Sequence, residues 1–281
     1  MRPKLQRILW FAATMFVASC SRTPLDPNEA SWRMLPGHVE RFSDPAFRAG
    51  RTCWVYLPPD YSASHDRYPV LYATDGELMF DGAGEMHVNR ICEDLIRSGE
   101  IRPIIVVAIE NVPGERFWDL APWYDYEFYS QGGGGEAFLR AIRDTLKPAI
   151  DRHFRTSPDP ANTAIAGVSL GGLFAAYAGL ESSDTFGNVA AFSPSYWLSR
   201  YRIERIADSL GVALPGRIRR YYQDTGTSHD NYIESMDRIL LASGFTQGLN
   251  FMSFTVQDAR HHYAAWAHRY PGMLRFLFGR R

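Results

Sequence analysis

A short motif near the middle of the chain places one serine between glycines at fixed spacing. Gly167-Val168-Ser169-Leu170-Gly171 follows the run 163–166 and precedes the small-residue run 173–180. Where a strand turns sharply into a helix, glycines two residues before and after a serine leave room for a strained backbone that projects the hydroxyl. The helix dipole and the amide of Leu170 would then stabilise a developing oxyanion. The motif predicts that Ser169 is a nucleophile; a glycine-rich turn that serves only close packing is the alternative.

The elements that must position this serine alternate along the chain. Strands are expected at 52–57, 69–73, 103–109, 162–166 and 188–192, with helices at 86–97, 136–154 and 171–180 and a kink or break near Pro148. The alternation continues through 219–224, 233–243, 250–256 and 264–278. Because the apolar run 103–109 is typical of a strand buried on both faces, the pattern predicts an α/β fold with a mostly parallel central sheet. Helices should cover both of its faces, and no break in composition divides residues 37–281.

Composition excludes several classes of protein. The 281 residues are 46% hydrophobic and 22% charged, as expected of a packed globular chain. With 30 basic and 31 acidic side chains, no electrostatic footprint for nucleic acid is present. Three cysteines exclude a disulfide-dense scaffold and a multi-cysteine zinc site, and Cys53 and Cys92 are expected to be buried thiols rather than a disulfide. The histidines are scattered and no phosphate-binding glycine loop is present, so no metal or cofactor is expected.

The first residues have the pattern of a secretory signal. Arg2, Lys4 and Arg7 precede the apolar run 8–17, which is too short to span a bilayer as a helix. Val17-Ala18-Ser19-Cys20 resembles the lipobox of bacterial lipoproteins. That resemblance implies cleavage before Cys20, a diacylglycerol on its thiol, and a membrane-anchored protein of the bacterial cell envelope that faces the periplasm. Ordinary signal cleavage is the alternative. The expected organisation is a signal at 1–19, a lipidated tether at 20–36 and one catalytic domain at 37–281.

Several further stretches carry a resemblance that covers about residues 50–280. They are the opening strands 55–61 and 68–76, NVPGERFWDLAP at 111–122, SPSYW at 193–197, and HHYAAW at 261–266. Together with the serine motif, they resemble the esterase family of the α/β-hydrolases. That family holds enterochelin (trilactone siderophore) esterases, S-formylglutathione hydrolase, and feruloyl and acetyl-xylan esterases. The resemblance implies an α/β-hydrolase fold and a serine carboxylic ester hydrolase.

The resemblance also implies the histidine that serves as the base. Histidine can take up and return a serine proton near neutral pH. The family pattern places it five residues before a tryptophan, which here is His261, with its neighbour His262 as the second candidate. His268, within the last expected helix, is interpreted as a surface or packing residue.

The acid that would orient this histidine is less well defined. The family places it in a D-x-G-T-x-[ED] loop, but here His229 stands at the acid position and Asp230 follows it. We predict Asp230 as the acid. Asp224, Asp258 and a serine–histidine dyad without an acid are the alternatives.

The remaining site residues are expected in loops at the carboxyl ends of strands. The resemblance assigns a second oxyanion donor to the backbone of Gly76 and Glu77; a plain Asp-Gly turn without this role is the alternative. Arg116 follows the strand 103–109, where a guanidinium can hold a carboxylate, catecholate or sugar hydroxyl of a substrate, or can instead pair with Asp119. Trp118 and Trp197 are expected to contact the substrate as part of an aromatic wall, and a lid that packs on the core is the alternative.

These expectations favour a serine esterase acting on a siderophore trilactone or on an aromatic or acetyl ester. An exported protein does not fit S-formylglutathione hydrolase, because that enzyme's substrate is cytosolic. A membrane-surface lipase is disfavoured because the sequence has no strongly apolar lid helix. The alternative from another class is a non-catalytic lipoprotein that binds a ligand or partner on a hydrolase scaffold.

Overall fold

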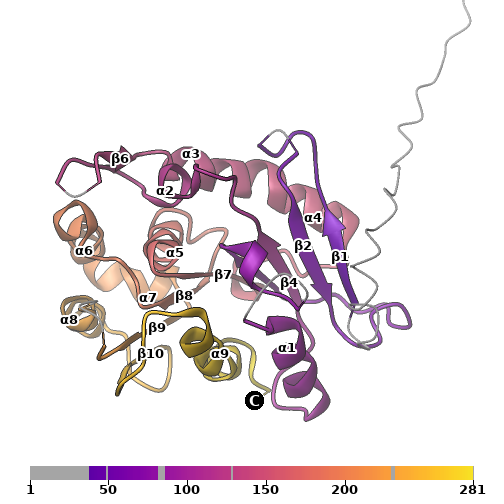
Figure 1. Cartoon of the computed structure of the whole chain (residues 1–281). Helices are drawn as coiled ribbons and strands as arrows, with labels where there is room; N and C mark the ends of the chain where they lie inside the picture. Colours follow the sequence, from indigo (N-terminus) through magenta and orange to yellow (C-terminus); the bar gives the residue numbers. More distant parts are fainter. Residues whose placement is uncertain (1–37, 49, 82–85, 128, 229–231, 281) are drawn as a thin grey trace, which may run out of the picture.

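The computed structural model describes residues 38–48, 50–81, 86–127, 129–228 and 232–280. Its centre is an eight-stranded sheet with the strand order β1-β2-β4-β3-β7-β8-β9-β10 (Figure 1). The strands are β1 (His38–Phe42), β2 (Cys53–Leu57), β3 (Val70–Ala73), β4 (Ile105–Ile109), β7 (Thr163–Val168), β8 (Asn188–Phe192), β9 (Arg220–Gly226) and β10 (Phe251–Val256). The pairs β1–β2 and β2–β4 are antiparallel, and all the other pairs in this sheet are parallel. The predicted mostly parallel sheet is confirmed.

Helices connect the strands and cover the sheet on both faces. The main ones are α1 (Val88–Arg97), α2 (Arg116–Leu120), α3 (Gly135–Ala141), α4 (Lys147–His153), α5 (Leu170–Glu181), α6 (Leu198–Leu210), α7 (Leu214–Arg217), α8 (Glu234–Ala242) and α9 (Tyr263–Phe278). A short hairpin, β5 (Tyr124–Asp125) with β6 (Gln131–Gly132), lies beside α2 (Figure 1).

Two hydrophobic cores lie on opposite faces of the sheet. In β4, Ile105, Val107 and Ile109 contribute to one core, whereas Val106 and Ala108 contribute to the other. Successive side chains of a strand point to opposite faces, so both sets must be apolar, which explains the unbroken apolar run in the sequence. Helices α3 to α8 cover the first core, and α1 and α9 cover the second.

The cysteines and the expected helix break follow from this packing. Cys53 belongs to the first core and Cys92 to the second, and both are buried free thiols, as predicted. The helix expected at 136–154 is divided by a π-helical segment, Ile142–Leu146, which ends two residues before Pro148. Proline lacks an amide hydrogen and its ring crowds the carbonyl four residues earlier, so a widened turn at this place relieves the conflict.

Within the described ranges, no helix has the length and apolar character needed to cross a membrane.

Candidate active site

Ser169 occupies a sharp turn between β7 and α5. Its backbone has φ 58° and ψ −117°, a combination that L-residues rarely adopt and that costs about 1–3 kcal/mol. A Cβ on Gly167 would lie 2.1 Å from the carbonyl oxygen of Gly171, so the chain segments on either side of the serine are in contact. The Ser169 amide donates to Phe192 O at 2.8 Å, which fixes the turn to the end of β8. The spacing of Gly167 and Gly171 is therefore explained by the close contact of the two chain segments, as the motif predicted.

His261 meets this serine from the loop between β10 and α9. Its Nε2 lies 2.8 Å from Ser169 Oγ, and both residues are half-buried. The imidazole packs edge-on against Trp266, with ring centroids 4.9 Å apart. The neighbouring His262 is exposed, and its Nδ1 accepts the Ala264 amide at the start of α9. Of the two adjacent histidines, the structure thus brings His261 to the serine and places His262 at a helix cap.

The acid predicted for this pair, Asp230, lies outside the described residues, as does His229. Both alternative carboxylates have other partners. Asp258 is exposed and its Oδ1 accepts from Gln257. Asp224, at the end of β9, is fully buried; it accepts the Tyr222 hydroxyl at 2.6 Å and lies 3.1 Å from Arg269 Nε. Burial raises the pKa of Asp224 to about 6, although Arg269 opposes this rise.

A buried polar cluster ties α9 to the ends of β8 and β9. The Ser193 hydroxyl accepts from Trp266 Nε1 at 3.1 Å and from Arg269 Nη2 at 3.0 Å. The Ser193 amide donates to the Asp224 carbonyl at 2.8 Å. Since His261 packs against Trp266, this cluster helps to hold the predicted base in place.

Two helices begin beside the serine. Leu170 is the first residue of α5, and Gly76 and Glu77 open the 3-10 helix Gly76–Leu78 that follows β3. The first amides of a helix have no partner within it, so they are available to an oxyanion. A Cβ on Gly171 would lie 3.0 Å from Asp75 Oδ2, which shows that the two helix starts are adjacent. The structure therefore brings the predicted oxyanion donors to the same place.

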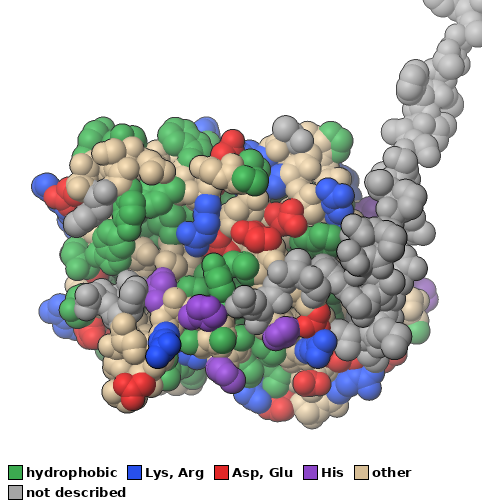
Figure 2. Space-filling view, in the orientation of Figure 1, with side chains coloured by type: hydrophobic (Ala, Val, Ile, Leu, Met, Phe, Trp, Pro, Cys, Tyr) green, Lys and Arg blue, Asp and Glu red, His purple; other side chains and the backbone are tan. Residues whose placement is uncertain are grey.

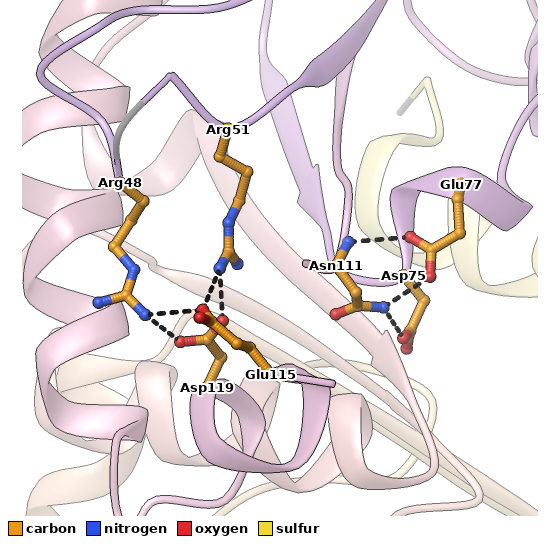
Figure 3. Close-up of polar contacts among 7 residues, drawn as sticks. All are labelled: Arg48, Arg51, Asp75, Glu77, Asn111, Glu115 and Asp119. Carbon is orange, nitrogen blue, oxygen red and sulfur yellow. Dashed lines mark hydrogen bonds and ion pairs between the residues drawn. The ribbon is translucent and has the colours of Figure 1, made fainter. Parts of the chain in front are cut away.

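Arg116 extends from α2 to the turn that holds these donors. Its Nε and Nη2 donate to the two oxygens of Asp75 at 2.5 and 3.0 Å, and the carboxylate is buried. Burial of the guanidinium disfavours its charge, but the hydrogen bonds and charge of Asp75 raise the pKa of Arg116 above its ordinary value. The alternative pairing of Arg116 with Asp119 is wrong. Asp119 is bound by Arg48 and Arg51, each through Nη2 at 2.5 Å (Figure 3).

Asn111 completes the contacts of this turn (Figure 3). Its side-chain nitrogen donates to Asp75 Oδ1 at 2.6 Å and to Glu77 Oε1 at 2.7 Å, and its amide donates to Glu77 Oε2 at 3.0 Å. Asn111 was not among the site residues predicted from the sequence. The available signal was its place at the end of the most apolar strand, in the same loop as Arg116.

Aromatic side chains form a wall beyond this turn. Trp197 packs against Tyr129 with ring centroids 6.2 Å apart, and Tyr129 packs against Phe117 at 4.8 Å. Trp118 is 50% exposed and its ring contacts Gly134. Figure 2 shows hydrophobic side chains gathered on the face that carries α2, β6 and α6. Trp197 thus belongs to this wall as a half-buried ring, and Trp118 lies on α2 beside Phe117 as an exposed ring. That either ring contacts a substrate stays a prediction.

No group of three or more histidine, cysteine or acidic side chains suited to a metal occurs in the part of the chain that the structure describes.

Comparisons with known proteins agree with this geometry. A family model described as "Putative esterase" matches residues 45–277. The protein YbbA of Bacillus subtilis is 25% identical over 242 residues, covering 80% of this chain and 92% of YbbA. The iron(III) enterobactin esterase of Dickeya dadantii is 27% identical over 209 residues, covering 70% of this chain. The match covers 45% of that esterase, so this chain corresponds to less than half of its length.

Solved structures share the fold. The BES protein from Bacillus cereus superposes with a TM-score of 0.69 at 19% identity, covering 85% of this chain and 96% of that one. Proteins named as feruloyl and siderophore esterases are among the further matches.

Proposed function

The chain belongs to the Putative esterase family, and from this premise we propose that it is a serine carboxylic ester hydrolase that forms an acyl-enzyme on Ser169. One observation carries the proposal: the strained serine has its hydroxyl 2.8 Å from Nε2 of His261. A scaffold that only bound a ligand would need neither the strained backbone nor a histidine at this distance.

The arrangement supports a two-step reaction. His261 Nε2 takes the proton as Ser169 Oγ attacks the ester carbonyl, and the amides of Leu170 and of the Gly76–Glu77 turn receive the oxyanion. His261 then gives the proton to the leaving alcohol, and the acyl group stays on the serine. Water, activated by the same imidazole, attacks the acyl carbonyl and releases the acid. Asp230 is proposed to orient the imidazole.

For the substrate, we propose a siderophore trilactone or an aromatic or acetyl ester. The aromatic wall of Phe117, Tyr129 and Trp197 supports a substrate that carries an aryl group, because such rings supply flat apolar contact area. The relatives include enterobactin and feruloyl esterases, which supports the same chemistry.

Hydrolysis of p-nitrophenyl acetate and butyrate tests the reaction. We expect turnover by the wild-type protein, a loss of about 10³-fold or more in Ser169→Ala, and labelling of Ser169 by a fluorophosphonate. Ser209→Ala is the matched control, since Ser209 lies exposed on α6 and bonds only to Ile206 O among the contacts of the described chain. Full turnover by Ser169→Ala would overturn the assignment of the nucleophile.

We further propose that the protein is lipid-anchored in the bacterial envelope, facing the periplasm, through Cys20. The support is the sequence pattern of residues 2–20 alone, and these residues lie outside the described ranges. In a bacterial host, radiolabelled palmitate should enter the wild-type protein and Ser21→Ala but not Cys20→Ser. Label retained by Cys20→Ser would refute the anchor.

A further inference from the structure

The Asp75 carboxylate is the point where three segments of the site meet. Asp75 follows β3 and has a left-handed backbone with φ 58° and ψ 44°. Its side chain reaches the start of α5, where a Cβ on Gly171 would lie 3.0 Å from Oδ2. Its oxygens are bound by Arg116 from α2 and by Asn111 from the end of β4. Any movement of this carboxylate would therefore move the turn that holds the second oxyanion donor.

The charge of this carboxylate opposes the proposed chemistry. Asp75 immediately precedes the amides of Gly76 and Glu77, and it is almost fully buried, so water screens its charge poorly. An oxyanion that formed beside those amides would be repelled by an unpaired carboxylate at this place. The bidentate guanidinium of Arg116 supplies the opposite charge in a fixed geometry.

We propose that Arg116 and Asn111 are positioning residues of the esterase reaction. They hold Asp75 in its left-handed turn and offset its charge, so that the amides of Gly76 and Glu77 face the oxyanion. Arg116 thereby acts on the transition state through Asp75, without touching the substrate. This inference rests on the proposed function, because it assigns how one half of the proposed oxyanion hole is maintained.

A positioning residue and a substrate-binding residue give different kinetics. p-Nitrophenyl acetate carries no carboxylate, catechol or sugar hydroxyl for a guanidinium to hold. If Arg116 only bound such a group, its loss would leave the rate on this ester unchanged and would raise KM for substrates that carry the group. If it positions and neutralises Asp75, its loss lowers kcat on the acetate and leaves KM nearly unchanged.

The test compares kcat and KM on p-nitrophenyl acetate among four variants and the wild-type chain. We expect Arg116→Gln to lower kcat by about 30- to 100-fold, which is at or below the lower limit of the range of about 10²–10³-fold for loss of a whole oxyanion donor, because the amides remain and are only displaced. Adding Asp75→Asn to Arg116→Gln should restore kcat at least about tenfold, because the uncompensated charge is gone. A purely structural role would not give this charge-dependent rescue.

Two variants complete the design. Arg48→Gln is the matched control, because Arg48 pairs with Asp119 on the same α2 helix, where Arg51 remains as a second partner. We expect it to keep kcat within about threefold of wild type. Asn111→Ser removes the side-chain donors to the turn and should lower kcat about five- to tenfold. If Arg116→Gln does not fold, Asn111→Ser becomes the deciding variant: an unchanged kcat in Asn111→Ser would then overturn the inference.

Each outcome has a distinct meaning. Unchanged kcat in Arg116→Gln, or no rescue by Asp75→Asn, overturns the inference while wild-type turnover leaves the esterase in place. No turnover by the wild-type protein overturns the proposed function and the inference together.

Discussion

Gly76→Ala offers a sharp test of the second oxyanion donor. An ideal Cβ at this position would lie 2.5 Å from the carbonyl carbon of Ala108 and 2.6 Å from backbone atoms of Ile109. These atoms belong to β4, which is hydrogen-bonded to β2 on one side and β3 on the other, so they cannot give way. Carbon atoms in contact normally lie about 3.5–4.0 Å apart, so the turn at Gly76 must move by about 1 Å.

A displacement of this size has a calculable effect on the reaction. A misplacement of about 1 Å costs on the order of 10²-fold in rate, and loss of one oxyanion donor costs about 10²–10³-fold. We therefore expect kcat on p-nitrophenyl acetate to fall about 100-fold, which corresponds to about 2.7 kcal/mol of transition-state stabilisation. KM should change less than about threefold, because the donor acts mainly on the oxyanion.

The assay is steady-state hydrolysis, measured well below the thermal midpoint of every variant. Gly216→Ala is the matched control, since Gly216 lies exposed on α7 and a Cβ there meets nothing within 4 Å. It should keep the wild-type kcat, and urea unfolding of both variants will show that each is folded. A folded Gly76→Ala variant with kcat within about threefold of wild type would refute the assignment of this turn.

Other expected outcomes concern the base, the acid and the buried carboxyl. His261→Gln should lower kcat by about 10³-fold or more. His262→Gln, which loses a cap of α9, should keep kcat and lose about 1 kcal/mol of unfolding free energy, and equal losses of kcat in the two variants would contradict the choice of base. Asp230→Asn should lower kcat by about 10²–10⁴-fold, whereas the control Asp258→Asn should keep the wild-type kcat. If kcat is unchanged in both variants, a serine–histidine dyad is favoured. The pKa of Asp224 is raised by burial from 3.8 to about 6, so between these values the folded protein binds more protons than the unfolded chain. Its free energy of unfolding should therefore fall by up to about 3 kcal/mol as the pH rises through this window, relative to Asp224→Asn. Urea midpoints of the two proteins from pH 4 to 7 measure this difference, and a constant difference would disprove it.

The features predicted well from sequence are those whose cause is local. The strand expected at 188–192 has those bounds in the structure, because five consecutive residues there are buried. The turn at Ser169 was predictable because the steric reason for its glycines lies within the five residues 167–171 themselves. His261 was identified through a motif that also contains Trp266, against which it packs.

The features that were missed depend on residues far apart in the chain. Asp75 and Arg116 are 41 positions apart, and no local pattern indicates that one binds the other. Helix α6 was not predicted either. It opens with Ser199, Arg200 and Tyr201 in left-handed conformation, which L-residues disfavour by about 1–2 kcal/mol each. An ion pair between Arg200 and the distant Glu127 contributes to holding that start in place.

The order of synthesis along the chain separates Ser169 in time from the histidine that it contacts. Ser169 precedes His261, its proposed base, by 92 residues, and His261 lies just before α9, the last helix that the structure describes. Until α9 docks, Phe192 lacks the Tyr270 ring that stacks on it 5.0 Å away, and one face of the sheet stays uncovered. On the proposed mechanism, we therefore expect a nascent chain in which α9 has not docked to be inert. Docking of α9 would complete the second core and bring the His261 imidazole to Ser169 at the same time.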